Sequence, residues 1–148
     1  MQVENRMSES SNQSYDIPES YFFTKDHEWA QRKADGNVLI GITDYAAKML
    51  HDIVYVTLPK AGEDLSRGSV LGQVESVKTV SDIYAPLSGK VLKSNDRLSK
   101  EPEIVSSSPY SNGWMLEVKA SNYESESKEL LSAEAYRKYI FELEEKEI

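Results

Sequence analysis

The sequence predicts a mainly β domain, folded as a compact barrel or sandwich. Between residues 28 and 119 the chain consists largely of short segments rich in apolar and β-branched residues. Glycine, proline, asparagine and serine separate these segments at short intervals, which is typical of all-β domains. The 148 residues suffice for one domain with its own core and are too few for two ordinary domains. One domain is therefore expected over residues 21–148.

A disordered, polar extension is predicted over residues 1–20. This segment contains four acidic residues, a single base, Arg6, and no apolar stretch. Secretory and transit sequences have the opposite pattern, so a cytoplasmic location is expected in preference to the mitochondrial matrix. The net charge of -8 would repel phosphates and anionic lipids. Nucleic acids and membranes are therefore not expected as partners.

The first predicted elements of the domain are a β-hairpin and a helix. The hairpin covers about residues 28–32 and 37–42, because the turn signal Asp35-Gly36 separates the two segments. A short helix is expected at about residues 44–51, where Thr43 can cap its first turn. Apolar residues recur there at helical spacing, and the face expected to be buried is formed by Ile42, Ala46, Met49 and Leu50.

Short strands and one more helical region complete the prediction. The β-branched run Ile53–Thr57 predicts a strand that ends before Pro59. Further strands are expected over residues 69–75, 80–85, 90–93 and 114–119. After Ser132, which can cap a helix, apolar residues follow a helical period. The face that should pack on the β core consists of Tyr136, Tyr139, Ile140 and Leu143.

The residue types needed for catalysis are mostly missing. There is no cysteine, so thiolate chemistry and disulfides are excluded. The two histidines, His27 and His51, lack the spacing of a metal site, and a structural or exposed role is expected for each. No glycine-rich phosphate loop and no convincing pair of nucleophile and base is found. Catalysis by the bare polypeptide is therefore not expected, which leaves room for a non-catalytic carrier whose reactive group is an attached cofactor.

One lysine lies in the most specific stretch of the sequence. Lys78 stands between two predicted strands, so a tight turn should present its amine to solvent. An isolated exposed lysine is usually no more than a solubilising charge. Here, however, Glu75-Ser76-Val77-Lys78 precedes Ser81-Asp82-Ile83-Tyr84-Ala85-Pro86 and Ser88-Gly89, and this segment closely resembles the lipoylation motif of glycine cleavage H-proteins. Gly89 lies eleven residues after the lysine, as in lipoyl and biotinyl domains.

The resemblance extends over about Tyr21 to Phe141. It implies a barrel-sandwich hybrid with a short internal helix and C-terminal helices. Lipoic acid would be joined by an amide to Lys78, and its dithiolane would supply the disulfide chemistry that a chain without cysteine lacks. The carrier would take the aminomethyl group of glycine from a pyridoxal-phosphate glycine decarboxylase to an aminomethyltransferase. A dihydrolipoamide dehydrogenase and a lipoyl-attaching enzyme would be its other partners, and a monomer is expected.

Three carboxylates are candidate site residues under this resemblance. Glu75 and Asp82 would help a lipoyl-attaching enzyme to recognise the turn, whereas Glu28 would lie near a cleft that shelters the loaded, cationic arm. For each of them an ordinary surface charge is the competing interpretation. His51 stands where the family usually has glycine, which adopts a positive φ more readily than histidine. Thr79 replaces a common alanine.

Two other functions remain open from the sequence. A lipoyl relay, which passes lipoate on to 2-oxoacid dehydrogenase subunits, would use the same lysine and the same motif. An unmodified interaction module would use the fold with a bare Lys78. A biotin carrier is disfavoured, because methionine would be expected beside the lysine where this chain has Val77 and Thr79.

Overall fold

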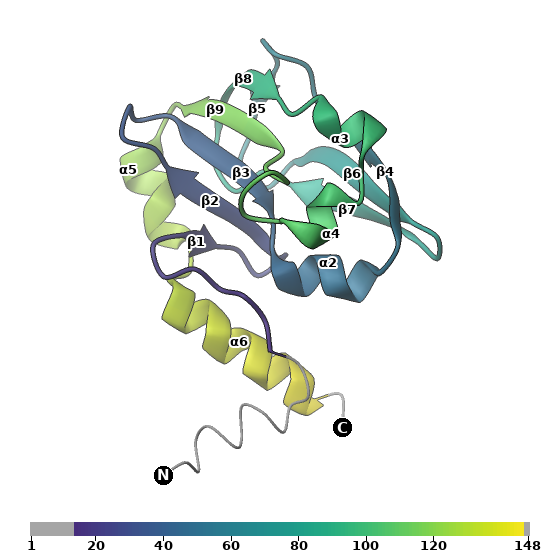
Figure 1. The fold of residues 1–148 in the computed structure, drawn as a ribbon. Coiled ribbons are helices and arrows are strands. Elements are labelled where there is room, and N and C mark those ends of the chain that lie inside the picture. Colours follow the sequence, from purple (N-terminus) through teal and green to yellow (C-terminus); the bar gives the residue numbers. More distant parts are fainter. Residues whose placement is uncertain (1–13, 147–148) are drawn as a thin grey trace.

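The computed structural model describes residues 14–146, which form two antiparallel sheets with short helices around them (Figure 1). The larger sheet has the order β1-β2-β3-β9-β8-β5, and the smaller has the order β4-β6-β7. The strands of the larger sheet are β1 (Phe22–Phe23), β2 (Glu28–Arg32), β3 (Val38–Ile42), β9 (Leu116–Ala120), β8 (Gly89–Ser94) and β5 (Asp64–Leu65). Those of the smaller sheet are β4 (Ile53–Thr57), β6 (Val70–Ser76) and β7 (Val80–Tyr84).

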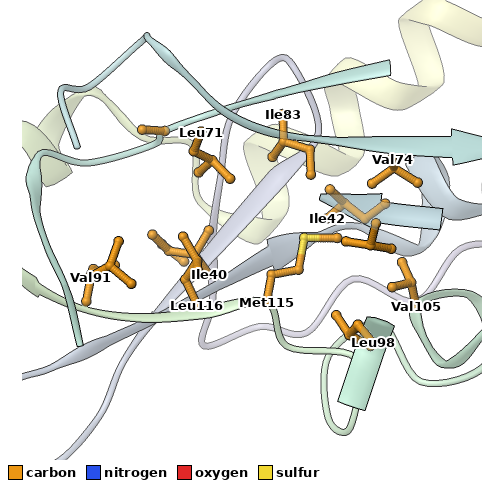
Figure 2. Close-up of a cluster of buried hydrophobic side chains, with 14 of the residues drawn as sticks. Ile40, Ile42, Leu71, Val74, Ile83, Val91, Leu98, Val105, Met115 and Leu116 are labelled. Atoms are coloured by element: carbon orange, nitrogen blue, oxygen red, sulfur yellow. The ribbon is translucent and has the colours of Figure 1, made fainter. Parts of the chain in front are cut away.

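The two sheets share one apolar core and do not close into a single barrel, which confirms the predicted barrel-sandwich hybrid. Figure 2 shows side chains of both sheets meeting in this core, among them Ile40 from β3 and Val74 and Ile83 from β6 and β7. Each is at most 2% exposed. Val74 faces Ser81 across the β6–β7 pair and Val56 across the β4–β6 pair, so one face of the small sheet supplies its part of the core. The opposite face remains exposed.

The helices lie at the periphery (Figure 1). They are α2 (Asp44–Leu50), α3 (Arg97–Lys100), α4 (Ile104–Ser107), α5 (Tyr123–Glu126), a 3-10 turn η1 (Ser127–Glu129) and α6 (Ala133–Lys146). The sequence prediction contained α2 and α6 and missed α3 and α4, which are too short for a periodic signal. No helix within residues 14–146 is both long and apolar enough to cross a membrane.

Helix α2 has the predicted cap and most of the predicted buried face. The Thr43 hydroxyl accepts the Ala46 N–H at 3.2 Å. Tyr45 and Ala47 are the buried apolar residues of the helix, whereas Met49 is 53% exposed. Of the predicted face, Ile42 is buried and Ala46 and Leu50 pack against the main core, so only Met49 was wrong. Tyr45, which the prediction left out, is buried in the second apolar cluster, where the ring of Tyr15 meets it edge-on at 4.9 Å.

A second apolar cluster lies between α6 and the larger sheet, as the apolar face of α6 predicted. Tyr136 and Ile140 are at most 3% exposed, and the ring of Phe23 stacks on Tyr136 with 4.6 Å between centroids. The Tyr136 hydroxyl lies 2.8 Å from Thr43 Oγ1 and 2.9 Å from Nδ1 of His27. This network ties α6 to the start of α2, so His27 has a structural role.

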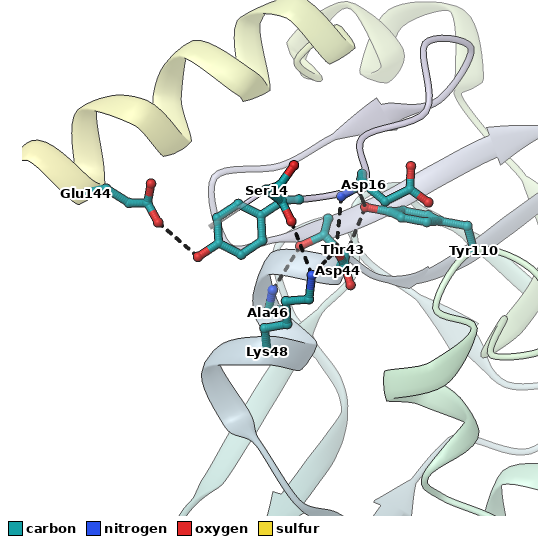
Figure 3. A network of polar contacts seen from close by, with 9 residues as sticks. Ser14, Asp16, Thr43, Asp44, Ala46, Lys48, Tyr110 and Glu144 are labelled. Carbon is teal, nitrogen blue, oxygen red and sulfur yellow. Dashed lines mark hydrogen bonds and ion pairs between the residues drawn. The ribbon is translucent and has the colours of Figure 1, made fainter. Parts of the chain in front are cut away.

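Residues 14–20 pack on the domain, although the sequence predicts an extension that is disordered through residue 20. The Tyr15 hydroxyl donates to Glu144 of α6 at 2.9 Å, and the Asp16 N–H donates to Asp44 of α2 at 3.0 Å (Figure 3). The ring of Tyr15 supplies an apolar contact to Tyr45, which the polar composition of the segment did not predict. The packed part of the described chain therefore includes residues 14–20, and residues 1–13 of the predicted extension lie outside the described residues.

Candidate functional site

Lys78 lies at the tip of the β6–β7 hairpin. The two strands pair from Val70 with Tyr84 to Glu75 with Val80, and the Ser76 N–H closes the turn by donating to the Thr79 carbonyl at 2.8 Å. Lys78 is exposed, and its ammonium has no hydrogen bond or ion pair within residues 14–146. The hairpin therefore presents a primary amine to solvent, as the sequence predicts.

The residue after α2 supports this tip from one side. His51 has φ 63° and ψ -134°, so the chain adopts here the positive φ for which glycine is suited. The next residue, Asp52, accepts the Val77 N–H at 3.1 Å through its backbone carbonyl. The strained residue thus directs the chain into a contact with the lysine turn.

Glu75 and Asp82 lie on the exposed face of the small sheet. Glu75 pairs with Tyr55 of β4 on one side and with Val80 of β7 on the other. Directly paired residues point to the same face, so the three side chains form a row next to the lysine turn. Tyr55 and Val80 are 55% and 53% exposed, which makes the row apolar on both sides of the carboxylate. In the following row, Asp82 accepts a hydrogen bond from the Gln73 amide at 3.0 Å.

Glu28 is buried and held by two donors. Only 2% of its surface is exposed. The Thr24 hydroxyl donates to Oε1 at 2.5 Å, and the Tyr84 N–H donates to Oε2 at 3.1 Å. Burial raises the pKa of Glu28 to about 7, although both hydrogen bonds act in the opposite direction. Glu28 is therefore not an ordinary surface charge.

A pocket of about 210 Å³ adjoins Glu28. It is lined by Thr24, Lys25, Asp26, Glu28, Arg67, Gly68, Tyr84, Ala85, Pro86, Glu129, Leu130 and Leu131. A cation that entered this pocket would meet a carboxyl group that is partly ionised near neutral pH, and it would favour the ionised form.

Strand β7 connects the two parts of the site. It begins two residues after Lys78 and ends at Tyr84, whose N–H binds Glu28. At roughly 3.3 Å per residue, the first and last residues of β7 are about 13 Å apart. The structure thus groups Glu75 and Asp82 with Lys78, and it places Glu28 at the far end of the same strand.

Some residues of the site were missed by the sequence analysis. Tyr84 and Thr24 hold the Glu28 carboxylate, and Arg67 lines its pocket. Tyr84 and Arg67 are far from Glu28 in the sequence, and the contact of Thr24 lies within a turn, so no periodic pattern indicated any of the three. Ser76 carried a local signal, because a serine just before a tight turn can bond to the backbone two or three residues on. That signal was not used.

Known proteins resemble this chain over most of its length. The family model described as glycine cleavage H-protein matches residues 21–143. A probable glycine cleavage system H protein of Thermococcus gammatolerans is 50% identical over 126 residues, which are 85% of this chain and 93% of the relative. The glycine cleavage system H protein of Staphylococcus saprophyticus is also 50% identical, over 85% of this chain and 98% of its own length.

A solved structure is similar as well. The crystal structure of a glycine cleavage system H protein from Mycobacterium marinum superposes with a TM-score of 0.74 at 40% identity. The match covers 81% of this chain and 95% of the other.

Proposed function

The chain belongs to the glycine cleavage H-protein family, and we propose that it acts through a lipoyl group joined by an amide to Lys78. Its role is that of the lipoyl carrier of the glycine cleavage system. The names of these relatives favour glycine cleavage over a lipoyl relay. The observation that carries the assignment to Lys78 is the exposed amine at the tip of a two-residue turn, which has no partner among residues 14–146.

The residues around Lys78 suit this group. The ammonium need not leave a partner in order to be acylated, because none holds it within residues 14–146. Conversion to an amide removes its charge. The lipoyl group supplies a dithiolane on a long arm, and with it the disulfide chemistry that a chain without cysteine lacks.

The exposed face of the small sheet is the proposed recognition surface for the lipoyl-attaching enzyme. Glu75 and Asp82 provide negative charge there, while Tyr55 and Val80 provide exposed apolar area. Interfaces commonly combine an apolar centre with polar groups at the rim. Glycine decarboxylase, aminomethyltransferase and dihydrolipoamide dehydrogenase are the further proposed partners, since each has to reach the arm on Lys78.

Glu28 is proposed to shelter the basic end of the loaded arm. Its carboxyl group lies in the pocket at the far end of β7, held in place by Thr24 and Tyr84. Burial raises the pKa of Glu28 to about 7, so its carboxyl group can gain or lose a proton near neutral pH. A cationic group that binds beside Glu28 would therefore draw it into the ionised state, forming a charge-assisted contact away from bulk water.

Mass spectrometry tests the assignment. The full chain is produced in cells supplied with lipoate and a lipoyl-attaching enzyme, and its intact mass and peptide map are measured beside those of Lys78→Arg. A lipoyl adduct on Lys78 that the variant lacks is the expected result. A bare Lys78 would refute the proposal and favour the unmodified interaction module.

The role of Glu28 has a separate test. In Glu28→Gln the loaded arm should lose its aminomethyl group faster, while attachment of the lipoyl group to Lys78 stays the same. An unchanged lifetime of the loaded arm would contradict the assignment of the pocket.

A further inference from the structure

The turn that carries Lys78 has an unusual composition for its length. Two-residue hairpin loops generally adopt turns that need positive φ, and they favour asparagine and glycine. Here the loop residues are Val77 and Lys78, and β-branched valine is among the residues least suited to positive φ. Within residues 14–146 the only non-glycine residues with positive φ are His27 and His51. The lysine turn must therefore be stabilised by something other than the usual turn geometry.

The side chain of Ser76 supplies that stabilisation. Its Oγ accepts the Lys78 N–H at 3.2 Å and the Thr79 N–H at 3.1 Å, and its hydroxyl lies 3.3 Å from the Thr79 carbonyl. In most hairpins a backbone carbonyl would accept the second of these N–H groups. Only 4% of Ser76 is exposed, so the hydroxyl is fixed beneath the turn and shielded from competing water.

All three amides of the tip consequently have fixed acceptors. The Val77 N–H donates to the carbonyl of Asp52, and the other two donate to Ser76. The backbone under Lys78 is thereby held on both sides, while the lysine side chain remains exposed and unpaired within the described residues.

We propose that Ser76 is a positioning residue for the acylation of Lys78, acting by holding the turn backbone in the form that the lipoyl-attaching enzyme binds. This inference rests on the proposed attachment of lipoate to Lys78. An enzyme that binds an ordered turn does not have to order it on binding, and that cost would otherwise appear as weaker binding. Loss of the hydroxyl should therefore raise KM for the carrier and leave kcat nearly unchanged.

The kinetic experiment compares the full-length wild type with three variants, using lipoate, ATP and a lipoate–protein ligase. Ser76→Ala should raise KM about fivefold, the change expected for loss of roughly one net hydrogen bond. Ser76→Thr keeps the hydroxyl and should restore most of the affinity. Ser125→Ala is the matched control, because Ser125 is exposed in α5, outside the hairpin that carries Lys78, and its hydroxyl makes only a local contact to the Asn122 carbonyl. An unchanged KM in Ser76→Ala would overturn the proposal.

Amide hydrogen exchange provides a readout independent of acylation. In Ser76→Ala the amides of Lys78 and Thr79 should exchange about tenfold faster, whereas that of Val77, bonded to Asp52, should change little. Equal acceleration throughout the chain would mean general destabilisation, and no acceleration at the two amides would mean that Ser76 does not hold them. Either result overturns the proposal. A wild type that accepts no lipoyl group would refute the proposed function instead, while the exchange pattern would still report on the turn.

Discussion

Replacement of His51 by glycine should make the protein more stable. At φ 63° and ψ -134°, a residue with a Cβ atom is strained, and such strain costs about 1 to 3 kcal/mol. Glycine removes that strain but adds about 0.4 to 1 kcal/mol of conformational entropy in the unfolded chain. The net gain is about 1 kcal/mol, which corresponds to a rise in Tm of about 3 °C for a domain of this size.

Thermal and urea unfolding of the two proteins measure this gain, and His51→Ala is the matched control. Alanine removes the exposed imidazole but keeps the Cβ atom, so its stability should stay within about 0.5 kcal/mol of the wild type. If His51→Gly were no more stable than His51→Ala, the strain argument would be refuted. The contact between Asp52 and Val77 should persist in the glycine variant, so acylation of the lysine should continue.

Three further predictions concern pH, recognition and the N-terminal segment. Because burial raises the pKa of Glu28 from 4.5 to about 7, its protonated form contributes stability that is complete below pH 4.5 and is lost as the pH rises through 7. Urea unfolding of the wild type and of Glu28→Gln measures this loss. The free energy of unfolding of the wild type, relative to that of the variant, should fall by about 2 to 3 kcal/mol between pH 4.5 and pH 8. If the two proteins showed the same dependence on pH, the prediction would be contradicted. Val80→Ser should raise KM for lipoyl attachment about threefold or more, whereas Val70→Ser, which removes an equally exposed valine at the other end of the hairpin, should not; equal effects would argue against the recognition surface. Removal of residues 1–20 should cost about 2 to 3 kcal/mol more than removal of residues 1–13, through lost contacts to α2 and α6, and calorimetry that found no difference would show that the packed segment adds no stability.

Local patterns predicted much of the fold. The β2–β3 hairpin, α2, β4 and α6 follow from turn residues, caps and periodicity, which act over a few residues. Strands β1 and β5 are only two residues long and form because a partner strand lies beside each of them. No local sequence pattern predicts such short strands. The burial of Tyr45 in α2 was missed for the same reason, because the ring of Tyr15 that packs on it comes from a distant part of the chain.

The site divides in the same way. Lys78, Glu75 and Asp82 lie within one hairpin, so the sequence alone determined that they would be close together, and the order of residues in the turn also placed Ser76 beneath the lysine. Even the positive φ at residue 51 was anticipated, from the glycine that the family has there.

The environment of Glu28 was decided only by the tertiary structure. Glu28 belongs to β2 in the larger sheet, whereas Tyr84, which donates to it, belongs to β7 in the smaller one. No local interaction brings these strands together. They meet because both sheets bury their apolar faces in a common core, and the same packing removes water from the carboxyl group and raises its pKa. The sequence therefore determined that Lys78 lies at an exposed turn, and only the packing of the two sheets decided that Glu28 would be a buried acid beside the end of β7.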